Sequence, residues 1–300
     1  MSDTGWLWIV FTLLAAGGQT IRNAMQRELT ATLGTAGATH VRFLFGFPFA
    51  VLFLGGLLLV TGAAFPSPPP VFWLWVMLGM GAQVLATALM LMAMGERSFV
   101  VTIAYIKTEP VQVALFGLIF LGDKLTFGMV TAILIATAGV VVMSLKPGGA
   151  ASDQSWRPTL IGLASGAAFA LSAIGYRGGI LSLGLSDYVM AATFTLTAGL
   201  LMQAVLLSAW LMWRSPDVMR AIVKAWRPSL FAGFMGATAS QFWFLAFALA
   251  TAASVRTLAL VEVLFAQAIS RFVFGHKTTA REGLGIVLIV AGVVLLIWAH

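Results

Sequence analysis

Residues 109–124, EPVQVALFGLIFLGDK, give the first indication of the fold, because they set one carboxylate within an apolar stretch. The stretch continues an apolar run that begins near residue 98, and Gly122-Asp123-Lys124 ends it. A helix of about 20 apolar residues is long enough to cross the hydrocarbon core of a bilayer. The run 98–121 therefore predicts a membrane-spanning helix with an ionisable residue near its middle.

The composition of the whole chain agrees with a membrane protein. Of its 300 residues, 60% are hydrophobic and only 9% are charged, and the mean hydropathy is +1.00. A soluble domain usually carries about 25% charged residues, because its surface faces water. Too few charges exist here to cover a water-facing exterior, so we expect lipid to surround most of the protein.

Further apolar runs of similar length occur along the whole chain. Closed barrels also satisfy backbone groups in lipid, but their strands alternate apolar and polar residues, and these runs do not alternate. We therefore predict an all-α bundle of ten transmembrane helices, near residues 5–24, 36–61, 71–94, 98–121, 125–145, 158–180, 187–213, 228–250, 254–274 and 283–299.

Basic residues gather in the loops on one side of this predicted bundle. The positive-inside rule places that side in the cytoplasm, which leaves both termini outside. The residues in or beside these loops are Arg22, Arg27, Arg97, Lys146, Arg157, Arg214, Arg220, Lys224, Arg227, Lys277 and Arg281, and the opposite side holds little beyond Lys124 and Arg177.

The quoted stretch has a counterpart 153 residues later, EVLFAQAISRFVFGHK at 262–277. This offset places Glu109 on Glu262, and it also aligns Gly122 with Gly275, Lys124 with Lys277 and Gly139 with Gly292. Each half of the chain holds five predicted helices, an odd number, so the halves cross the membrane in opposite directions. We predict two inverted five-helix repeats, 1–147 and 156–300, that form one transmembrane domain around a central cavity.

The order of these features resembles the drug/metabolite transporter superfamily, in its EamA-like branch. The resemblance rests on Glu109-Pro110 in the fourth helix, on Leu121-Gly122-Asp123-Lys124, on the Gly139-Val-Val end of the fifth helix, and on Arg42-Phe43 in the second. It covers nearly the whole chain. It implies inverted five-helix halves, a central cavity, transport without ATP hydrolysis, and a multi-pass protein of the bacterial inner membrane.

Two carboxylates are the first candidates for a substrate site. Glu109 and Glu262 lie near the middle of their predicted helices, where an ionisable group costs several kcal/mol unless it is paired or hydrated. Such a residue marks a functional site by default and suits a proton carrier or a ligand for a substrate amine. The alternative is that each carboxylate pairs with a base and locks two helices together.

Bases and a proline surround Glu109. Lys107 is two residues away and points to another side of the helix, so it cannot pair well with Glu109 and needs a partner elsewhere. Pro110 removes a backbone donor, which predicts a kink that leaves a polar notch beside Tyr105, Lys107 and Glu109. Arg256 and Arg271 lie near opposite ends of the ninth predicted helix, where we expect them to snorkel toward headgroups.

Other polar and aromatic residues complete the predicted site. Gln83 and Gln241 add hydrogen-bonding groups within apolar helices, and Trp243 can stack on a cationic substrate, although packing is the simpler role. Gly162-x-x-x-Gly166 predicts only a close helix contact. The full set of predicted substrate-binding residues is Glu109, Lys107, Tyr105, Arg42, Gln83, Gln241, Trp243 and Glu262.

We predict a secondary transporter that exports a small polar or zwitterionic metabolite, such as an amino acid, by alternating access. Glu109 and Lys107 suit the opposite charges of one such substrate, and protons are a candidate coupling ion. A multidrug or organic-cation exporter would use Glu109 and the aromatics without Lys107. An anion carrier of the sugar-phosphate type would need clustered bases, and a lipid flippase is a further alternative.

The sequence disfavours several other classes. It has no cysteine, and its three histidines lie far apart, so we expect no metal and no other cofactor. No nucleophile–base pair or Walker A motif favours an enzyme, and no basic domain favours nucleic acid. Besides substrate and membrane lipids, the expected partner is at most a second copy of the chain, so the protein is a monomer or a homodimer.

Overall fold

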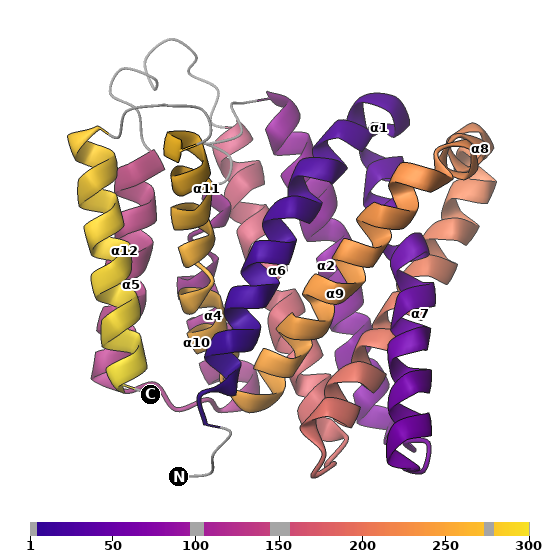
Figure 1. Cartoon of the computed structure of the whole chain (residues 1–300), viewed down its shortest axis with the longest axis horizontal. Coiled ribbons are helices and arrows are strands. Elements are labelled where there is room, and N and C mark those ends of the chain that lie inside the picture. The colour runs from indigo at the N-terminus through magenta and orange to yellow at the C-terminus, as the bar shows by residue number, and fades with distance from the viewer. Residues whose placement is uncertain (1–4, 97–104, 145–156, 273–278, 300) are drawn as a thin grey trace. The chain divides into compact units, whose positions relative to one another are not determined.

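The structure is a computed structural model of the chain, and it describes residues 5–96, 105–144, 157–272 and 279–299 (Figure 1). All regular elements in these ranges are helical, which confirms the predicted helical class. They are α1 (Leu7–Thr61), α2 (Pro70–Glu96), α4 (Glu109–Phe116), the π-helix η1 (Gly117–Leu121), α5 (Phe127–Ser144), α6 (Arg157–Ser182), α7 (Tyr188–Arg214), α8 (Pro216–Lys224), α9 (Trp226–Leu249), α10 (Ala252–Leu258), α11 (Val261–Phe272) and α12 (Ala280–Ala299).

Among the described residues, six helices are long and apolar enough to cross a membrane. This agrees with a multi-pass membrane protein, while the predicted ten crossings and their inverted arrangement stay predictions. The six segments are Glu28–Thr61, Pro70–Ala93, Thr159–Ser182, Tyr188–Arg214, Trp226–Leu249 and Ala280–Ala299. Residues 98–104 of the predicted run 98–121 lie outside the described residues. The same holds for Arg97, Lys146, His276 and Lys277.

Helix α1 covers most of the predicted run 5–24 and all of the run 36–61, as two helical segments that meet at a kink. Its backbone leaves the helical conformation at Gly34, where φ is 67° and ψ is 175°. Only glycine adopts this conformation at low cost, because a side chain would clash with the backbone. Gly34 therefore divides α1 into two arms.

The chain forms two compact units, and each draws on both halves of the sequence. Unit 1 contains residues 1–84 and 175–250, and unit 2 contains residues 85–174 and 251–300. The boundaries fall within α2 and within α6. Unit 1 thus holds α1, α7, α8 and α9, and unit 2 holds α4, α5, α10, α11 and α12.

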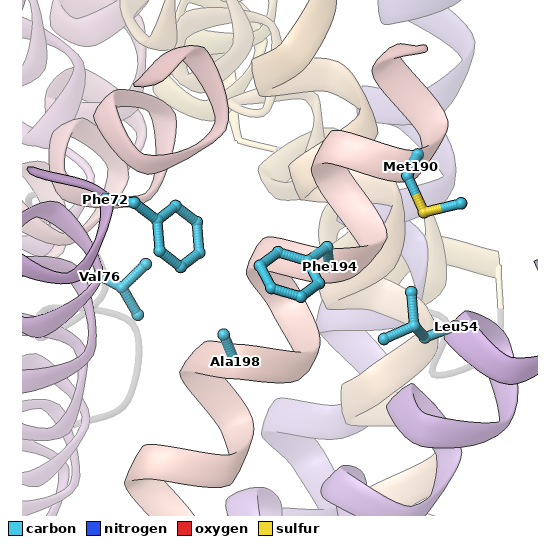
Figure 2. Close-up of a cluster of buried hydrophobic side chains, with 6 residues drawn as sticks. All are labelled: Leu54, Phe72, Val76, Met190, Phe194 and Ala198. Atoms are coloured by element: carbon cyan, nitrogen blue, oxygen red, sulfur yellow. The ribbon is translucent and has the colours of Figure 1, made fainter. Parts of the chain in front are cut away.

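An apolar cluster in unit 1 joins three helices (Figure 2). Met190, Phe194 and Ala198 repeat every four residues along α7, so they form one stripe of that helix. Phe72 and Val76 of α2 and Leu54 of α1 pack against this stripe. The rings of Phe72 and Phe194 lie 5.5 Å apart between centroids.

In unit 2, glycines bring α5 and α12 into close contact. A Cβ atom placed on Gly139 would lie 2.8 Å from the carbonyl oxygen of Gly285 and 2.8 Å from the amide nitrogen of Ile289. A Cβ atom on Gly292 would lie 2.6 Å from the amide nitrogen of Ala136. The two backbones touch because both glycines lack a side chain, as small residues allow between helices in a membrane.

Candidate functional site

The predicted substrate-binding residues fall into two groups, one in each unit. Unit 2 contains Tyr105, Lys107, Glu109 and Glu262, and unit 1 contains Arg42, Gln83, Gln241 and Trp243. The group in unit 2 carries the buried charges, and it lies where two helices are interrupted.

The first interruption precedes Glu109. Residues Lys107 and Thr108 form a turn, and α4 begins at Glu109 with Pro110 in its first turn. The hydroxyl of Thr108 donates to the carbonyl of Tyr105 at 2.8 Å, and the amide of Val111 donates to the carbonyl of Thr108 at 3.2 Å. Proline is well suited to this position, because the first helical turn leaves backbone donors unused anyway. The predicted kink at Pro110 is thus a helix start.

The second interruption separates α10 from α11 at Ala259 and Leu260. Two short-range backbone hydrogen bonds span this break. The amide of Leu260 donates to the carbonyl of Thr257 at 3.1 Å, and the amide of Glu262 donates to the carbonyl of Ala259 at 3.0 Å. The range 254–274 contains no glycine and no proline, so the sequence carries no signal for this break. As a result, Glu262 lies in the first turn of α11, as Glu109 lies in the first turn of α4.

Two ion pairs connect these interrupted segments. The Nζ atom of Lys107 lies 2.5 Å from Oε2 of Glu262, and Nε of Arg256 lies 3.1 Å from Oε1 of Glu109. The four side chains each expose between 7% and 10% of their surface. Glu109 also interacts electrostatically with Lys107 and Glu262, so the four residues form one cluster, here called the four-charge cluster.

The four-charge cluster confirms one prediction and corrects another. Lys107 and Glu109 do not pair with each other but with residues of α10 and α11, as their spacing of two residues indicates. The snorkelling predicted for Arg256 is wrong, because its side chain is nearly buried and pairs with Glu109. The interruption of the helix before Leu260 places Arg256 beside α4. The side chain of Arg271 lies outside the described part of the structure.

Helix α6 supports the cluster from one side. A Cβ atom on Gly162 would lie 2.8 Å from Cβ of Tyr105, and one on Gly166 would lie 3.1 Å from the carbonyl oxygen of Ile106. The two glycines thus accommodate the interrupted segment before α4, which confirms the close helix contact predicted for Gly162-x-x-x-Gly166. Tyr105 is half-buried against α6.

The unit 1 group is embedded in hydrogen bonds between helices. Gln83 accepts from the hydroxyl of Tyr176 at 3.1 Å, Gln241 donates to Thr193 at 2.8 Å, and the indole of Trp243 donates to Gln19 at 3.1 Å. Trp243 is 4% exposed, which fits the packing role. The guanidinium of Arg42 lies 5.2 Å from the ring centroid of Phe43.

Two further arginines in unit 1 were predicted in or beside loops, but the structure places Arg22 within α1 and Arg177 within α6. Arg22 is 2% exposed and packs with Arg42 against Gly236 of α9. Arg177 donates to the carbonyls of Phe247 and Ala250, the first at 2.5 Å, at the C-terminal end of α9. A cation there complements the negative end of the helix dipole. In the sequence, Arg22 falls on Arg177 at an offset of 155 (177 − 22), close to the offset of 153 that aligns Glu109 with Glu262.

The described residues contain no group of three or more histidine, cysteine, aspartate or glutamate side chains that could hold a metal ion. The four-charge cluster itself offers two carboxylates, one ammonium and one guanidinium. Such a set can bind and release ionic groups of a ligand or transfer protons.

Comparison with known proteins shows the fold. No family model and no curated protein matches the sequence. A solved crystal structure, described only as that of a protein, is similar with a TM-score of 0.69 and 16% identical residues. The similarity covers 97% of this chain and 99% of that one, so it extends over the whole fold.

Proposed function

We propose that the protein is a secondary transporter of the drug/metabolite transporter type, and that it exports a small zwitterionic metabolite, such as an amino acid, by alternating access. The observation that carries this proposal is the four-charge cluster at the two helix interruptions. Interrupted helices are common features of transporter binding sites, because their ends offer unpaired backbone groups to a substrate.

The charge balance of the cluster favours a zwitterion. Removing one partner of a buried ion pair leaves the other charge uncompensated, which costs about 3–5 kcal/mol. A carboxylate of the substrate can replace Glu262 beside Lys107, and its ammonium can replace Arg256 beside Glu109. The displaced Glu262 and Arg256 carry opposite charges, so a substrate with both charges leaves the cluster neutral, whereas a simple cation or anion adds an uncompensated charge.

The contacts between α5 and α12 support the inverted repeat. The offset of 153 carries Gly139 to Gly292 and Ala136 to Ile289, and the observed contacts are Gly139 with Ile289 and Gly292 with Ala136. Exchanging the two repeats therefore converts one contact into the other, as a two-fold axis between the repeats requires. Two repeats related in this way, with five helices each, make up the ten crossings of the proposed plan.

The composition of unit 2 also supports this proposal. This unit holds α4, α5, α10, α11 and α12, which cover the last two predicted helices of each half. Each repeat contributes its last two predicted helices to unit 2. This unit can therefore move as a rigid body in the membrane while the contacts within it persist. Both glutamates of the repeat, Glu109 and Glu262, belong to this unit.

A ligand screen by thermal unfolding in detergent tests the proposal. Amino acids, amines, organic cations and sugar phosphates are compared, because a ligand at 100 times its dissociation constant stabilises the folded state by about 2.7 kcal/mol. We expect an amino acid to raise the melting temperature, and we expect Glu109→Gln and Lys107→Ala to remove this shift. Glu28→Gln and Lys124→Ala, at exposed positions, are the matched controls.

Transport in proteoliposomes separates the alternatives. If Glu109→Gln leaves uptake of the stabilising amino acid and its pH dependence intact, the proposed mechanism is wrong. Stabilisation by cations alone, with activity that survives Lys107→Ala, would indicate a multidrug or organic-cation exporter. Stabilisation by sugar phosphates alone would indicate an anion carrier.

A further inference from the structure

The segment 212–227 connects two apolar helices through a short amphipathic one, α8. On one side of α8, Ile222 is fully buried. A Cβ atom on Gly37 would lie 3.0 Å from Cγ1 of Val218 and 3.9 Å from Cδ1 of Ile222. Helix α8 thus packs its apolar side on α1, three residues beyond the break at Gly34.

The opposite side of the segment is basic. Arg220 and Lys224 are four residues apart and share one face of α8, and Arg214 and Arg227 flank the helix. All four are exposed, and the one acidic residue in the segment is Asp217, so four positive charges minus one negative charge give a net charge of +3. Arg220 lies 2.9 Å from Asp217, but an ion pair this exposed contributes little and leaves the guanidinium accessible.

Large apolar side chains are exposed beside these bases. Trp213 exposes 83% of its surface, Val223 61% and Trp226 50%, and the guanidinium of Arg227 lies 5.4 Å from the ring centroid of Trp226. Tryptophan and basic residues occur together where a protein surface meets lipid headgroups, because the ring prefers the interface and the base prefers phosphate.

The position of α8 agrees with a location at the level of the lipid headgroups. It follows α7 and precedes α9, and both of these are long and apolar enough to cross the membrane. Figure 1 shows α8 nearly along its axis, whereas α9 runs in the plane of the picture, so α8 crosses the end of α9. A short amphipathic helix between the ends of two spans lies along the membrane surface.

We infer that residues 212–227 form a binding site for the headgroups of anionic phospholipids. Arg220, Lys224 and Arg227 bind the phosphates, and Trp213 and Trp226 lie at the level of the glycerol groups. The inference concerns a surface of unit 1 and does not rest on the proposed transport function.

Native mass spectrometry of the full-length protein in detergent, titrated with phosphatidylglycerol or phosphatidylcholine, tests this site. Each base near an anionic surface changes the affinity about fivefold. We therefore expect Lys224→Gln to weaken phosphatidylglycerol binding about fivefold, and Arg220→Gln/Lys224→Gln to weaken it about 25-fold. Phosphatidylcholine binding should not change in either variant. Lys124→Gln removes another exposed lysine, in unit 2, and should bind phosphatidylglycerol as the wild type does.

Three outcomes would overturn the inference. Equal weakening of phosphatidylglycerol binding by Lys224→Gln and Lys124→Gln would show a general effect of charge. Unchanged binding in Arg220→Gln/Lys224→Gln would show that these bases do not bind the lipid. Displacement of phosphatidylglycerol by millimolar inorganic phosphate would identify free phosphate as the ligand. Because Arg220 and Lys224 are exposed, the variants should melt at the wild-type temperature without lipid, which separates a binding defect from misfolding.

Discussion

At the scale of single residues, the two buried ion pairs are the most consequential feature of this protein. Two charges of each sign are withdrawn from solvent, and each pair joins the segment around α4 to α10 or α11. The attraction within a buried pair repays the cost of desolvation only while both partners are present. The pairs are therefore sensitive to single substitutions and tolerant of matched double ones.

We expect Lys107→Met to lower the free energy of unfolding by about 3–5 kcal/mol, because Glu262 loses the ammonium at 2.5 Å. Lys107→Met/Glu262→Leu should recover most of this loss, since a buried pair can be replaced by apolar residues at little cost. Unfolding in detergent with increasing denaturant measures both. Lys107→Met/Glu109→Leu, which combines residues of different pairs, should be no more stable than Lys107→Met, and equal recovery by the two double variants would contradict the assigned pairing.

At the scale of helices, glycine decides where backbones bend and where they touch. Gly34 bends α1, whereas Gly139 and Gly292 allow α5 and α12 to come into contact. The first effect depends on a backbone conformation, and the second depends on the absence of a Cβ atom. A change to alanine should therefore destabilise the protein at either kind of position, for a different physical reason in each case.

Gly34→Ala should destabilise the protein by about 1–3 kcal/mol, because its φ of 67° and ψ of 175° belong to a region that only glycine adopts readily. Thermal unfolding compares it with Gly55→Ala in the same helix. No atom lies within 4 Å of a Cβ atom placed on Gly55, and alanine favours a helix over glycine by up to about 1 kcal/mol, so that variant should be neutral or more stable. Equal melting temperatures for the two variants would argue against the break.

Gly292→Ala should also destabilise, by about 1–3 kcal/mol, since its Cβ atom would lie 2.6 Å from the amide nitrogen of Ala136 and force α12 away from α5. Gly283→Ala is the control on the same helix, because nothing lies within 4 Å of its added Cβ atom. The difference in melting temperature between these two variants measures how much the close contact between α5 and α12 contributes to stability. A Gly292→Ala protein as stable as Gly283→Ala would mean that the two helices can separate freely.

At the scale of the whole molecule, the distribution of charge predicts the orientation in the membrane. In unit 1, exposed bases cluster in α8 and its flanks, whereas the connection from α6 to α7, residues 183–187, carries only Asp187. The positive-inside rule places α8 in the cytoplasm and the connection outside. With the ten crossings predicted from the sequence, both chain termini would then lie outside.

The absence of cysteine makes this orientation easy to measure. We expect a membrane-impermeant maleimide to label Ser186→Cys in intact cells and to label Lys224→Cys only after the membrane is opened. Both positions are exposed, so a difference in labelling reports sidedness and not burial. Labelling of Lys224→Cys alone in intact cells would reverse the orientation and would move the proposed lipid site to the outer leaflet.

Composition and the length of apolar runs were enough to predict a helical membrane protein, because lipid imposes these properties on every residue of a crossing helix. The spacing of Lys107 and Glu109 likewise predicts that they do not pair, since two residues along a helix turn side chains to different sides. These are local properties, and one sequence contains them in full.

The partners of the buried charges depended on the tertiary structure. Nothing in the sequence pairs Glu109 with Arg256 or Lys107 with Glu262, because the partners are about 150 residues apart. The break before Leu260 occurs without glycine or proline, so contacts with other helices must maintain it. The structure also separates Arg42, Gln83, Gln241 and Trp243 from Glu109 into another compact unit. Which residues come together depends on packing between helices that are far apart in the sequence, and local sequence patterns do not specify that packing.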